Sequence, residues 1–222
     1  MRPRGSPPFE VVFFDMDGTL TDRISSWEWV HRHFGVDNKT SWEAFLRGEI
    51  DDLEFMRRDI ALWKAKGGAR ISLERIRRAL HDIPLVPGAR ELVEALHARG
   101  TRTIIVTGGL DVLAERVCEE LGIHQHVGNG LCVDEHGYLL ADGVLRVPVN
   151  DKGKPVRRIL DELGVEALDA AAIGNSGQDA RMFEQCGFGV AFDPLDDEVR
   201  KAADVVIEEK DLRCAIPHLA GV

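Results

Sequence analysis

The feature of this sequence that most constrains its fold is a series of short apolar runs separated by helical patterns. Three runs are nearly uninterrupted, and each is followed by glycine or aspartate within two residues: Val11–Phe14, Thr103–Val106 and Ala170–Ile173. Such runs are typical of strands that are buried on both faces of a sheet. Two weaker candidates for further strands follow at Gly189–Phe192 and Val205–Ile207.

Amphipathic patterns fill much of the sequence between these runs. Pro87, a residue favoured in the first turn of a helix, precedes the first of them. Three sets of apolar residues recur at helical spacing: Leu92, Val93 and Leu96; Leu110, Leu113, Val117 and Leu121; and Val156, Ile159, Leu160 and Leu163. The alternation of strand and helix predicts an α/β fold with a doubly wound, mostly parallel sheet.

One long segment, residues 22–85, interrupts the alternation with purely helical patterns. We therefore expect residues 1–21 and 86–222 to form the α/β core domain and residues 22–85 to form an inserted, all-helical cap domain. All four tryptophans fall in this cap, and they either line a pocket that faces the sheet or build the cap's own core. We expect the second role for three of the four, because aromatic side chains carry most of the burial in a small unit.

A second interruption covers residues 126–147. Val127–Gly130 and Glu135–Gly137 both have the composition of turns. We expect these turns to frame a short antiparallel excursion from the sheet.

Charge and cysteine usage exclude several classes of protein. The 222-residue chain has a formal net charge of −10, which argues against nucleic-acid binding but not against a small anionic substrate near a metal ion. The four cysteines are scattered without a CxxC pair, as expected in a reducing compartment. No apolar run approaches the roughly 20 residues of a membrane span, and no secretion signal is evident. We expect a cytoplasmic protein without a membrane partner; its oligomeric state is not indicated.

Two carboxylates at the end of the first strand carry the main chemical signal. Asp15 and Asp17 are two residues apart, so in an extended chain their side chains point the same way, and Gly18 allows a tight turn. One carboxylate could attack phosphorus and form an acyl phosphate, while the other protonates the leaving oxygen. Because both groups and the substrate are anionic, a bound cation is almost required, and Mg²⁺ suits an all-oxygen site.

Further polar signals follow the other strands. Thr107, Gly108 and Gly109 could hold phosphate through a hydroxyl and backbone N–H groups at a helix N-terminus. Lys152 stands at the start of a helix, where a cation needs an anionic partner; the neighbouring Lys154 is the competing candidate. The segment 174–179 offers more oxygen ligands, although Asn175 or Ser176 could simply cap the next helix.

With these motifs the chain resembles the haloacid dehalogenase superfamily, in the branch similar to phosphoserine phosphatase. The resemblance runs from Asp15–Thr21 through the helical insert to the C-terminal stretch 201–213. It implies Asp15 as the nucleophile and Asp17 as the general acid/base. It also implies Lys152 as the lysine that stabilises phosphate and nucleophile, and a set of phosphate- or substrate-binding positions: Gly18, Thr107, Gly108, Gly109 and Gln178.

The same resemblance implies the magnesium ligands. They would be the Asp15 side chain, the Asp17 backbone carbonyl and the residue at position 175, with Asp179 supporting them. Position 175 is usually aspartate in this family and is Asn175 here, and position 178 is often asparagine in close relatives and is Gln178 here.

The cap also departs from the family pattern. Relatives that bind phosphoserine place an acidic residue where this chain has Ile24, with Glu28 about one helical turn away. They place an arginine for the substrate carboxylate where Asp59 aligns, although Arg57 and Arg58 are adjacent. The resemblance therefore extends to the catalytic core and not to the substrate.

We expect a phosphomonoesterase that acts on a small phosphorylated metabolite through an aspartyl phosphate. One alternative is a phosphotransferase, in which an alcohol accepts the phosphoryl group from Asp15. The other is a catalytically weakened phosphate-binding or regulatory module, suggested by Asn175.

Overall fold

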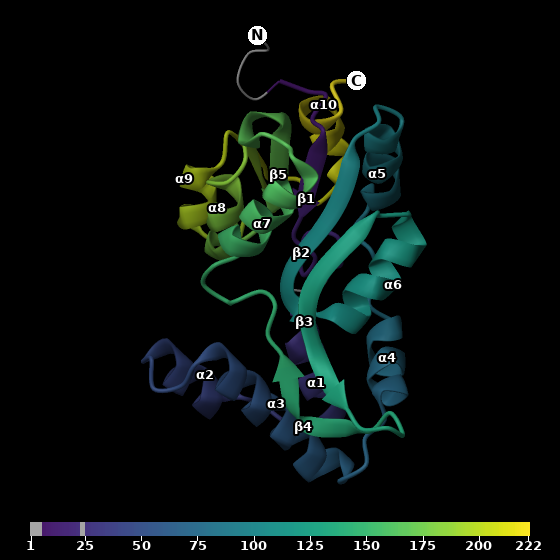
Figure 1. Ribbon diagram of the computed structural model, residues 1–222, viewed down its shortest axis with the longest axis vertical. Coiled ribbons are helices and arrows are strands. Elements are labelled where there is room, and N and C mark those ends of the chain that lie inside the picture. Colours follow the sequence, from purple (N-terminus) through teal and green to yellow (C-terminus); the bar gives the residue numbers. More distant parts are fainter. Residues whose placement is uncertain (1–5, 23–24) are drawn as a thin grey trace.

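The computed structural model describes residues 6–22 and 25–222. In these residues seven strands form one sheet in the order β4-β3-β2-β1-β5-β6-β7, in which only the β3–β4 pair is antiparallel (Figure 1). All five strands expected from the sequence are present, which confirms the predicted sheet. The strands are β1 (Val11–Phe14), β2 (Arg102–Leu110), β3 (Gln125–Val133), β4 (Leu139–Val144), β5 (Ala170–Gly174), β6 (Phe188–Phe192) and β7 (Val205–Ile207).

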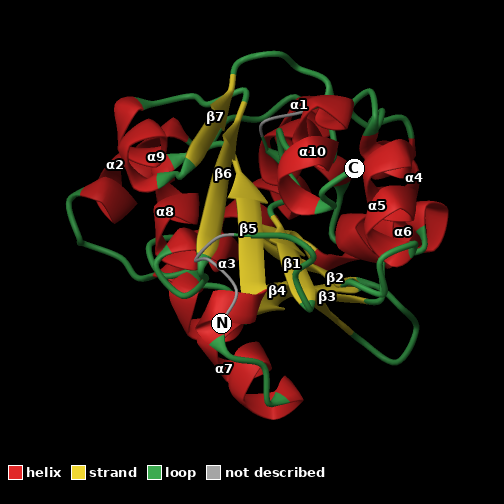
Figure 2. Cartoon of the chain, turned by 90° about the horizontal axis from the view of Figure 1, so that it is seen from above, coloured by secondary structure: helices red, strands yellow, loops and turns green. Residues whose placement is uncertain are grey.

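Helices cover both faces of this sheet (Figure 2). Alternate side chains of β1 point to opposite faces: Val12 and Phe14 belong to one apolar core, Val11 and Phe13 to the other. This two-sided burial explains why the strand is apolar throughout. The first core packs against α5 (Ala89–His97), α6 (Asp111–Leu121) and α10 (Ile216–Leu219), and the second against α7 (Gly153–Leu163), α8 (Gly177–Phe183) and α9 (Asp197–Ala202).

Four further helices follow β1 and lie at one end of the molecule beside β4 (Figure 1). They are α1 (Ser26–Phe34), α2 (Lys39–Leu46), α3 (Asp52–Gly67) and α4 (Leu73–His81). Backbone bonds tie them to the β3–β4 hairpin, since Leu139 N–H donates to the carbonyl of Ile71 and Leu73 N–H donates to that of Gly137. These bonds join the helical insert to a hairpin that lies outside residues 22–85. The boundaries expected for the two domains therefore stay a prediction.

One of the two expected turns is wrong. Residues 127–130 lie inside β3, where Val127 pairs in parallel register with Val106. The glycines there serve close packing, because a Cβ at Gly128 would lie 3.1 Å from the backbone of Asp111. The other turn is confirmed at Gly137, whose φ of 78° favours glycine. No helix in the described part of the chain combines the length and apolar character that a membrane crossing requires.

Candidate active site

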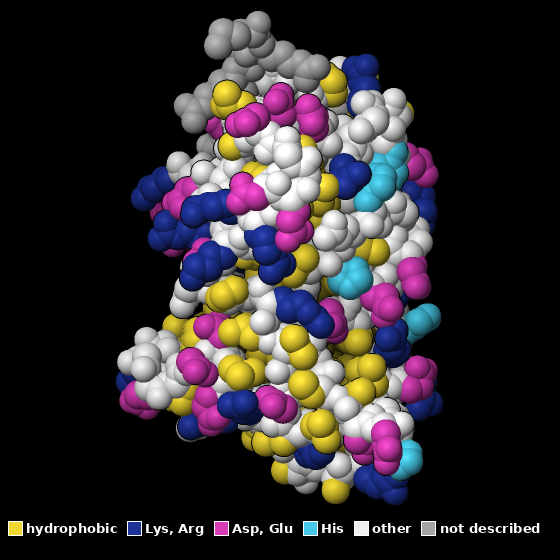
Figure 3. Space-filling model, viewed as in Figure 1, with side chains coloured by type: hydrophobic (Ala, Val, Ile, Leu, Met, Phe, Trp, Pro, Cys, Tyr) yellow, Lys and Arg dark blue, Asp and Glu magenta, His cyan; other side chains and the backbone are white. Residues whose placement is uncertain are grey.

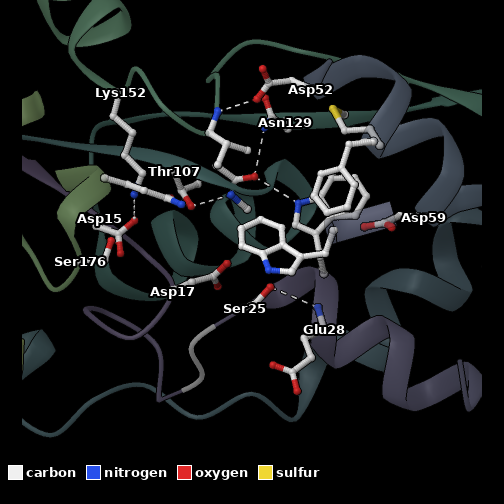
Figure 4. A pocket seen from close by; sticks show the side chains of 18 of the residues that line it. Asp15, Asp17, Ser25, Glu28, Asp52, Asp59, Thr107, Asn129, Lys152 and Ser176 are labelled. Atoms are coloured by element: carbon white, nitrogen blue, oxygen red, sulfur yellow. Dashed lines mark hydrogen bonds and ion pairs between the residues drawn. The ribbon is translucent and has the colours of Figure 1, made fainter. Parts of the chain in front are cut away.

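A cavity of about 470 Å³ lies at the carboxyl ends of β1, β2 and β5, with α1, α2 and α3 forming its opposite wall (Figure 4). This is the edge at which open parallel sheets bind ligands. Eight of the ten predicted site residues line the cavity: Asp15, Asp17, Thr107, Gly108, Gly109, Lys152, Asn175 and Gln178. The other two, Gly18 and Asp179, lie behind this lining and hold it in place.

Asp15 is buried directly after β1, where its N–H donates to the carbonyl of Ile173 on β5. Its Oδ1 accepts a hydrogen bond of 2.6 Å from Lys152 Nζ, and its Oδ2 one of 3.3 Å from Thr19 Oγ1. Burial raises the pKa of Asp15 to about 7, and the nearby charge of Asp179 adds to that rise while Lys152 opposes it. The carboxylate is thus fixed in position with one oxygen anchored to a cation.

Lys152 occupies the residue before α7 and is buried between two carboxylates. Its Nζ lies 2.6 Å from Asp15 Oδ1 and 2.7 Å from Asp179 Oδ1. Burial by itself lowers the pKa of this ammonium, but the two carboxylates raise it on balance. The competing Lys154 is 76% exposed and pairs with Asp151, so the structure distinguishes the two lysines clearly.

Asp17 faces the same cavity with one oxygen anchored and the other unpaired. Ser26 donates to Asp17 Oδ2 from its backbone N–H at 2.9 Å and from its hydroxyl at 2.7 Å. Asp17 Oδ1 is buried without a hydrogen-bond partner. Burial raises the pKa of Asp17, against the two Ser26 bonds that lower it. Ser26 is not among the predicted site residues, because its only signal in the sequence is a serine pair before a helical stripe.

The segment predicted to bind phosphate is not the helix N-terminal loop expected from the sequence. Thr107, Gly108 and Gly109 belong to the last part of β2, and α6 begins only at Asp111. The Gly109 N–H is already used, since it donates to Thr107 Oγ1 at 2.9 Å. Gly109 is nevertheless required for space, because a Cβ there would lie 2.4 Å from Asp17 Oδ2.

A second missed residue, Asn129, fixes the end of β2. Its amide nitrogen donates to the carbonyls of Gly108 and Val147, and its amide oxygen accepts from the N–H groups of Arg146 and Val147. The expected turn at residues 127–130 concealed this role, because it removed Asn129 from the sheet.

The turn after β5 packs tightly against the turn after β1. Gly18 has a φ of 87°, and a Cβ on it would lie 2.1 Å from Asn175 Nδ2, so only glycine fits. The Asn175 amide lies 3.4 Å from the carbonyl oxygen of Asp17. Asp179 Oδ2 accepts from the N–H groups of Asn175 and Ser176. Ser176 is the residue that caps α8, which leaves the Asn175 side chain facing the cavity.

The helical wall of the cavity is aromatic and acidic. Two tryptophans line it rather than the one expected: Trp27, whose indole N–H donates to the Gly108 carbonyl, and Trp42, which is 40% exposed. Trp63 is fully buried and matches the predicted core role. Phe55 and Met56 from α3 complete the apolar part of this wall.

The predicted specificity positions are only partly resolved by this geometry. Ile24 lies outside the described residues. Glu28 lines the cavity but pairs with Arg32 at the surface, and Figure 4 shows its side chain directed away from Asp15. The adjacent arginines at positions 57 and 58 do not line the cavity and pair with other carboxylates, whereas Asp59 does line it.

Comparison with known proteins agrees with this architecture. The model of the haloacid dehalogenase-like hydrolases matches residues 12–184. A phosphoserine phosphatase of Methanocaldococcus jannaschii is 29% identical over 95% of this chain and 97% of its own length. Another from Albidiferax ferrireducens is 33% identical over 92% of this chain and 86% of its own. A solved structure described as a phospho-aspartyl intermediate analogue of phosphoserine phosphatase superposes with a TM-score of 0.79 and 26% identity, covering 96% and 100% of the two chains.

The fold and these matches define a hydrolase with a Rossmann-like core and a helical insert. The chain belongs to the haloacid dehalogenase-like hydrolases, in the branch similar to phosphoserine phosphatases. The predicted resemblance is therefore confirmed, as is the predicted enzyme class, a phosphatase.

Proposed function

We propose that this protein is a Mg²⁺-dependent phosphomonoesterase that transfers the phosphoryl group of a small metabolite to Asp15 and then to water. One observation carries the proposal: Asp15 and Asp17 stand side by side in the cavity wall in different environments. Asp15 is held by Lys152, whereas Asp17 keeps a buried, unpaired oxygen. A nucleophile and a general acid need two carboxylates in different environments, so that one can react as the anion while the other carries a proton.

The residues present fit a magnesium ion. The donors available at the base of the cavity are the Asp15 carboxylate, the Asp17 carbonyl and the Asn175 amide, all of which can present oxygen. Asn175 directs its nitrogen at the Asp17 carbonyl, and a half-turn of the amide would present its oxygen instead. When bound, the ion would supply positive charge between the nucleophile and the phosphate.

In the first step an Asp15 oxygen would attack phosphorus, and the bond from phosphorus to the ester oxygen would break. Asp17 would give its proton to the departing alkoxide, so the alcohol leaves neutral. The raised pKa of Asp17 favours the protonated form that this step needs. Lys152 would stay at Asp15 Oδ1 and orient the carboxylate, leaving Oδ2 to react.

In the second step water would attack the phosphorus of the acyl phosphate on Asp15. Asp17, now ionised, would take the proton from that water, and the bond between phosphorus and the Asp15 oxygen would break. The products are inorganic phosphate and the regenerated carboxylate. Ser26 keeps Asp17 on the cavity side in both steps through its two hydrogen bonds.

The substrate proposed is a small phosphorylated metabolite. Phosphoserine, which the relatives' names indicate for those proteins, is one candidate. We also propose a cytoplasmic location without a nucleic-acid partner, which the free cysteines and the net charge of −10 support.

The test is hydrolysis of p-nitrophenyl phosphate with and without Mg²⁺, combined with acid quenching of ³²P-labelled substrate to trap the acyl phosphate. Label at Asp15 and metal-dependent release of phosphate are expected. Transfer of phosphate to added glycerol in preference to water would identify a phosphotransferase, and no turnover at any magnesium concentration would identify a catalytically weakened module.

A further inference from the structure

The helical wall of the cavity contains a carboxylate that the proposed chemistry does not use. Asp59 on α3 lines the cavity yet is only 2% exposed. Figure 4 shows Asp15 and Asp59 on opposite sides of the pocket, with aromatic rings in the view between them. Buried carboxylates are normally paired with a cation, since an unpaired buried charge is costly.

Asp59 is hydrogen-bonded, but its partners inside the protein are neutral. Asn38 Nδ2 lies 3.1 and 3.2 Å from its two oxygens, and His31 Nε2 lies 3.2 Å from Oδ2. The indole N–H of Trp63 donates to His31 Nδ1 at 2.7 Å. Because an indole can only donate, His31 Nδ1 must be the unprotonated nitrogen, and the ring is neutral with its hydrogen on Nε2.

No charged side chain compensates Asp59 among the described residues. None of their lysines or arginines forms an ion pair with it, and Lys152 is the only lysine or arginine among those that line the cavity. Lys152 is already occupied by the carboxylates of Asp15 and Asp179. Asp59 thus presents a buried negative charge without a matching cation on the wall opposite the nucleophile.

The surfaces between these two carboxylates suit an organic cation. Trp27, Trp42 and Phe55 line the cavity, and the rings of Trp42 and Phe55 lie 5.9 Å apart. Aromatic faces attract ammonium groups through their quadrupole, and they do so most strongly where water is excluded. A carboxylate behind aromatic walls is an arrangement that recognises an ammonium group.

We propose that Asp59 determines specificity for a phosphomonoester whose alcohol carries an ammonium group and no carboxylate, the class of amino-alcohol phosphates. The phosphate would lie at Asp15, and the ammonium group would lie against Asp59 between the aromatic walls. This inference rests on the proposed phosphatase function and names the substrate class of the same site. A substrate carboxylate would meet the negative charge of Asp59 without a matching cation.

The test compares charged substrates with neutral substrates of the same shape. Phosphocholine is paired with 3,3-dimethylbutyl phosphate and phosphoethanolamine with n-propyl phosphate, and kcat/KM is measured for each with phosphoserine alongside. The wild-type protein is expected to prefer the cation in each pair by about 10-fold, with phosphoserine below the cationic substrates. Asp59→Asn should bring this ratio close to one, whereas Asp52→Asn, which alters another carboxylate of the cavity, should leave the ratio in place.

Several outcomes would overturn the proposal. They are a wild-type ratio near one, a ratio that Asp59→Asn leaves unchanged because both members of a pair lose equally, and phosphoserine as the best substrate. The wild-type ratio needs no variant, so the test survives if Asp59→Asn fails to fold. Turnover of p-nitrophenyl phosphate separates the two levels: activity there without preference for cations refutes only this inference, and no activity there refutes the proposed function.

Discussion

The two walls of the cavity differ in how their polar groups are satisfied. At the sheet edge, Asp15, Lys152 and Asp179 form a chain of short ion pairs in which each charge has a partner. On the helical wall, the Asp59 carboxylate has only neutral partners and aromatic neighbours. The Asp15–Lys152–Asp179 chain therefore has its charges paired without a substrate, whereas Asp59 would gain a matching cation only from outside.

The distribution of exposed hydrophobic side chains also differs between the two parts of the molecule. Hydrophobic side chains gather in the lower part of Figure 3, over the region of α2, α3 and β4. Exposed members of this group include Trp42, Leu46, Leu140 and Val144. If the sheet edge sets the reaction and the helical wall selects the substrate, changes at the edge should lower kcat for every phosphate, and changes in the wall should shift KM selectively.

The largest effect is expected at the nucleophile. Asp15→Asn should lower kcat by at least about 10³-fold on all substrates, because an amide cannot attack phosphorus. The fold should persist, since Lys152 keeps Asp179 as a partner. Turnover of p-nitrophenyl phosphate and the thermal unfolding curve measure the two parts. Near-normal turnover in this variant would contradict the acyl-phosphate mechanism.

The next effect concerns the buried cation. Lys152→Met leaves Asp15 and Asp179 facing each other without compensation, which should cost about 3–5 kcal/mol of unfolding free energy and most of the activity. Lys154→Met is the matched control, because that lysine is exposed and its loss should change stability by less than about 0.5 kcal/mol. Denaturant unfolding of both variants checks this, and equal losses would show that position 152 carries no special charge balance.

Asp17 separates the two chemical roles at the sheet edge. Asp17→Asn should lower kcat by about 10²- to 10⁴-fold on an alkyl phosphate, whose leaving group needs a proton. The loss on p-nitrophenyl phosphate should be much smaller, because that leaving group departs as an anion. Equal losses on both substrates would contradict the role of general acid, and Ser26→Ala should show the same pattern in weaker form.

The sheet edge and the helical wall also differ in how well the sequence predicted them. Five strands of the sheet and the catalytic candidates at its edge could be predicted, because each candidate follows a buried apolar run in the chain. Ser26 and Asn129 could not, since each makes its site contacts with residues nine or more positions away and carries no motif. The charge of Asp59 was visible as a departure, but the tautomer of His31 that leaves it uncompensated requires the fold.

A wall substitution should act on KM. Trp42→Leu removes a half-exposed ring that lies tilted against Phe55, with the ring centroids 5.9 Å apart. Its loss should weaken binding of an amino-alcohol phosphate by about 1 kcal/mol, or roughly 5-fold in KM. The value of kcat should change little, because Trp42 belongs to α2 on the helical wall and not to the sheet edge that carries Asp15 and Asp17. Steady-state kinetics on phosphocholine and its neutral isostere measure both constants, and a loss confined to kcat would break the proposed division of labour.

The smallest effect is expected at the sheet edge, at the proposed metal site between the turns that follow β1 and β5. Asn175 is buried, and its amide nitrogen lies 3.4 Å from the carbonyl oxygen of Asp17. As a neutral amide it adds no negative charge to the proposed magnesium ligands. Asn175→Asp would place a carboxylate against that carbonyl oxygen, an arrangement that is repulsive until a cation lies between them. Without Mg²⁺ the variant should therefore unfold at a lower temperature than the wild type, and Mg²⁺ should recover more stability in the variant.

Half-saturation of activity should move to a roughly 3- to 10-fold lower Mg²⁺ concentration, because an anionic ligand holds a hard cation more strongly than a neutral one. Unfolding curves and activity titrations across magnesium concentrations measure both shifts. If neither moves, position 175 does not contact the metal, and Asn175 serves only to pack the turn after β5 against Gly18.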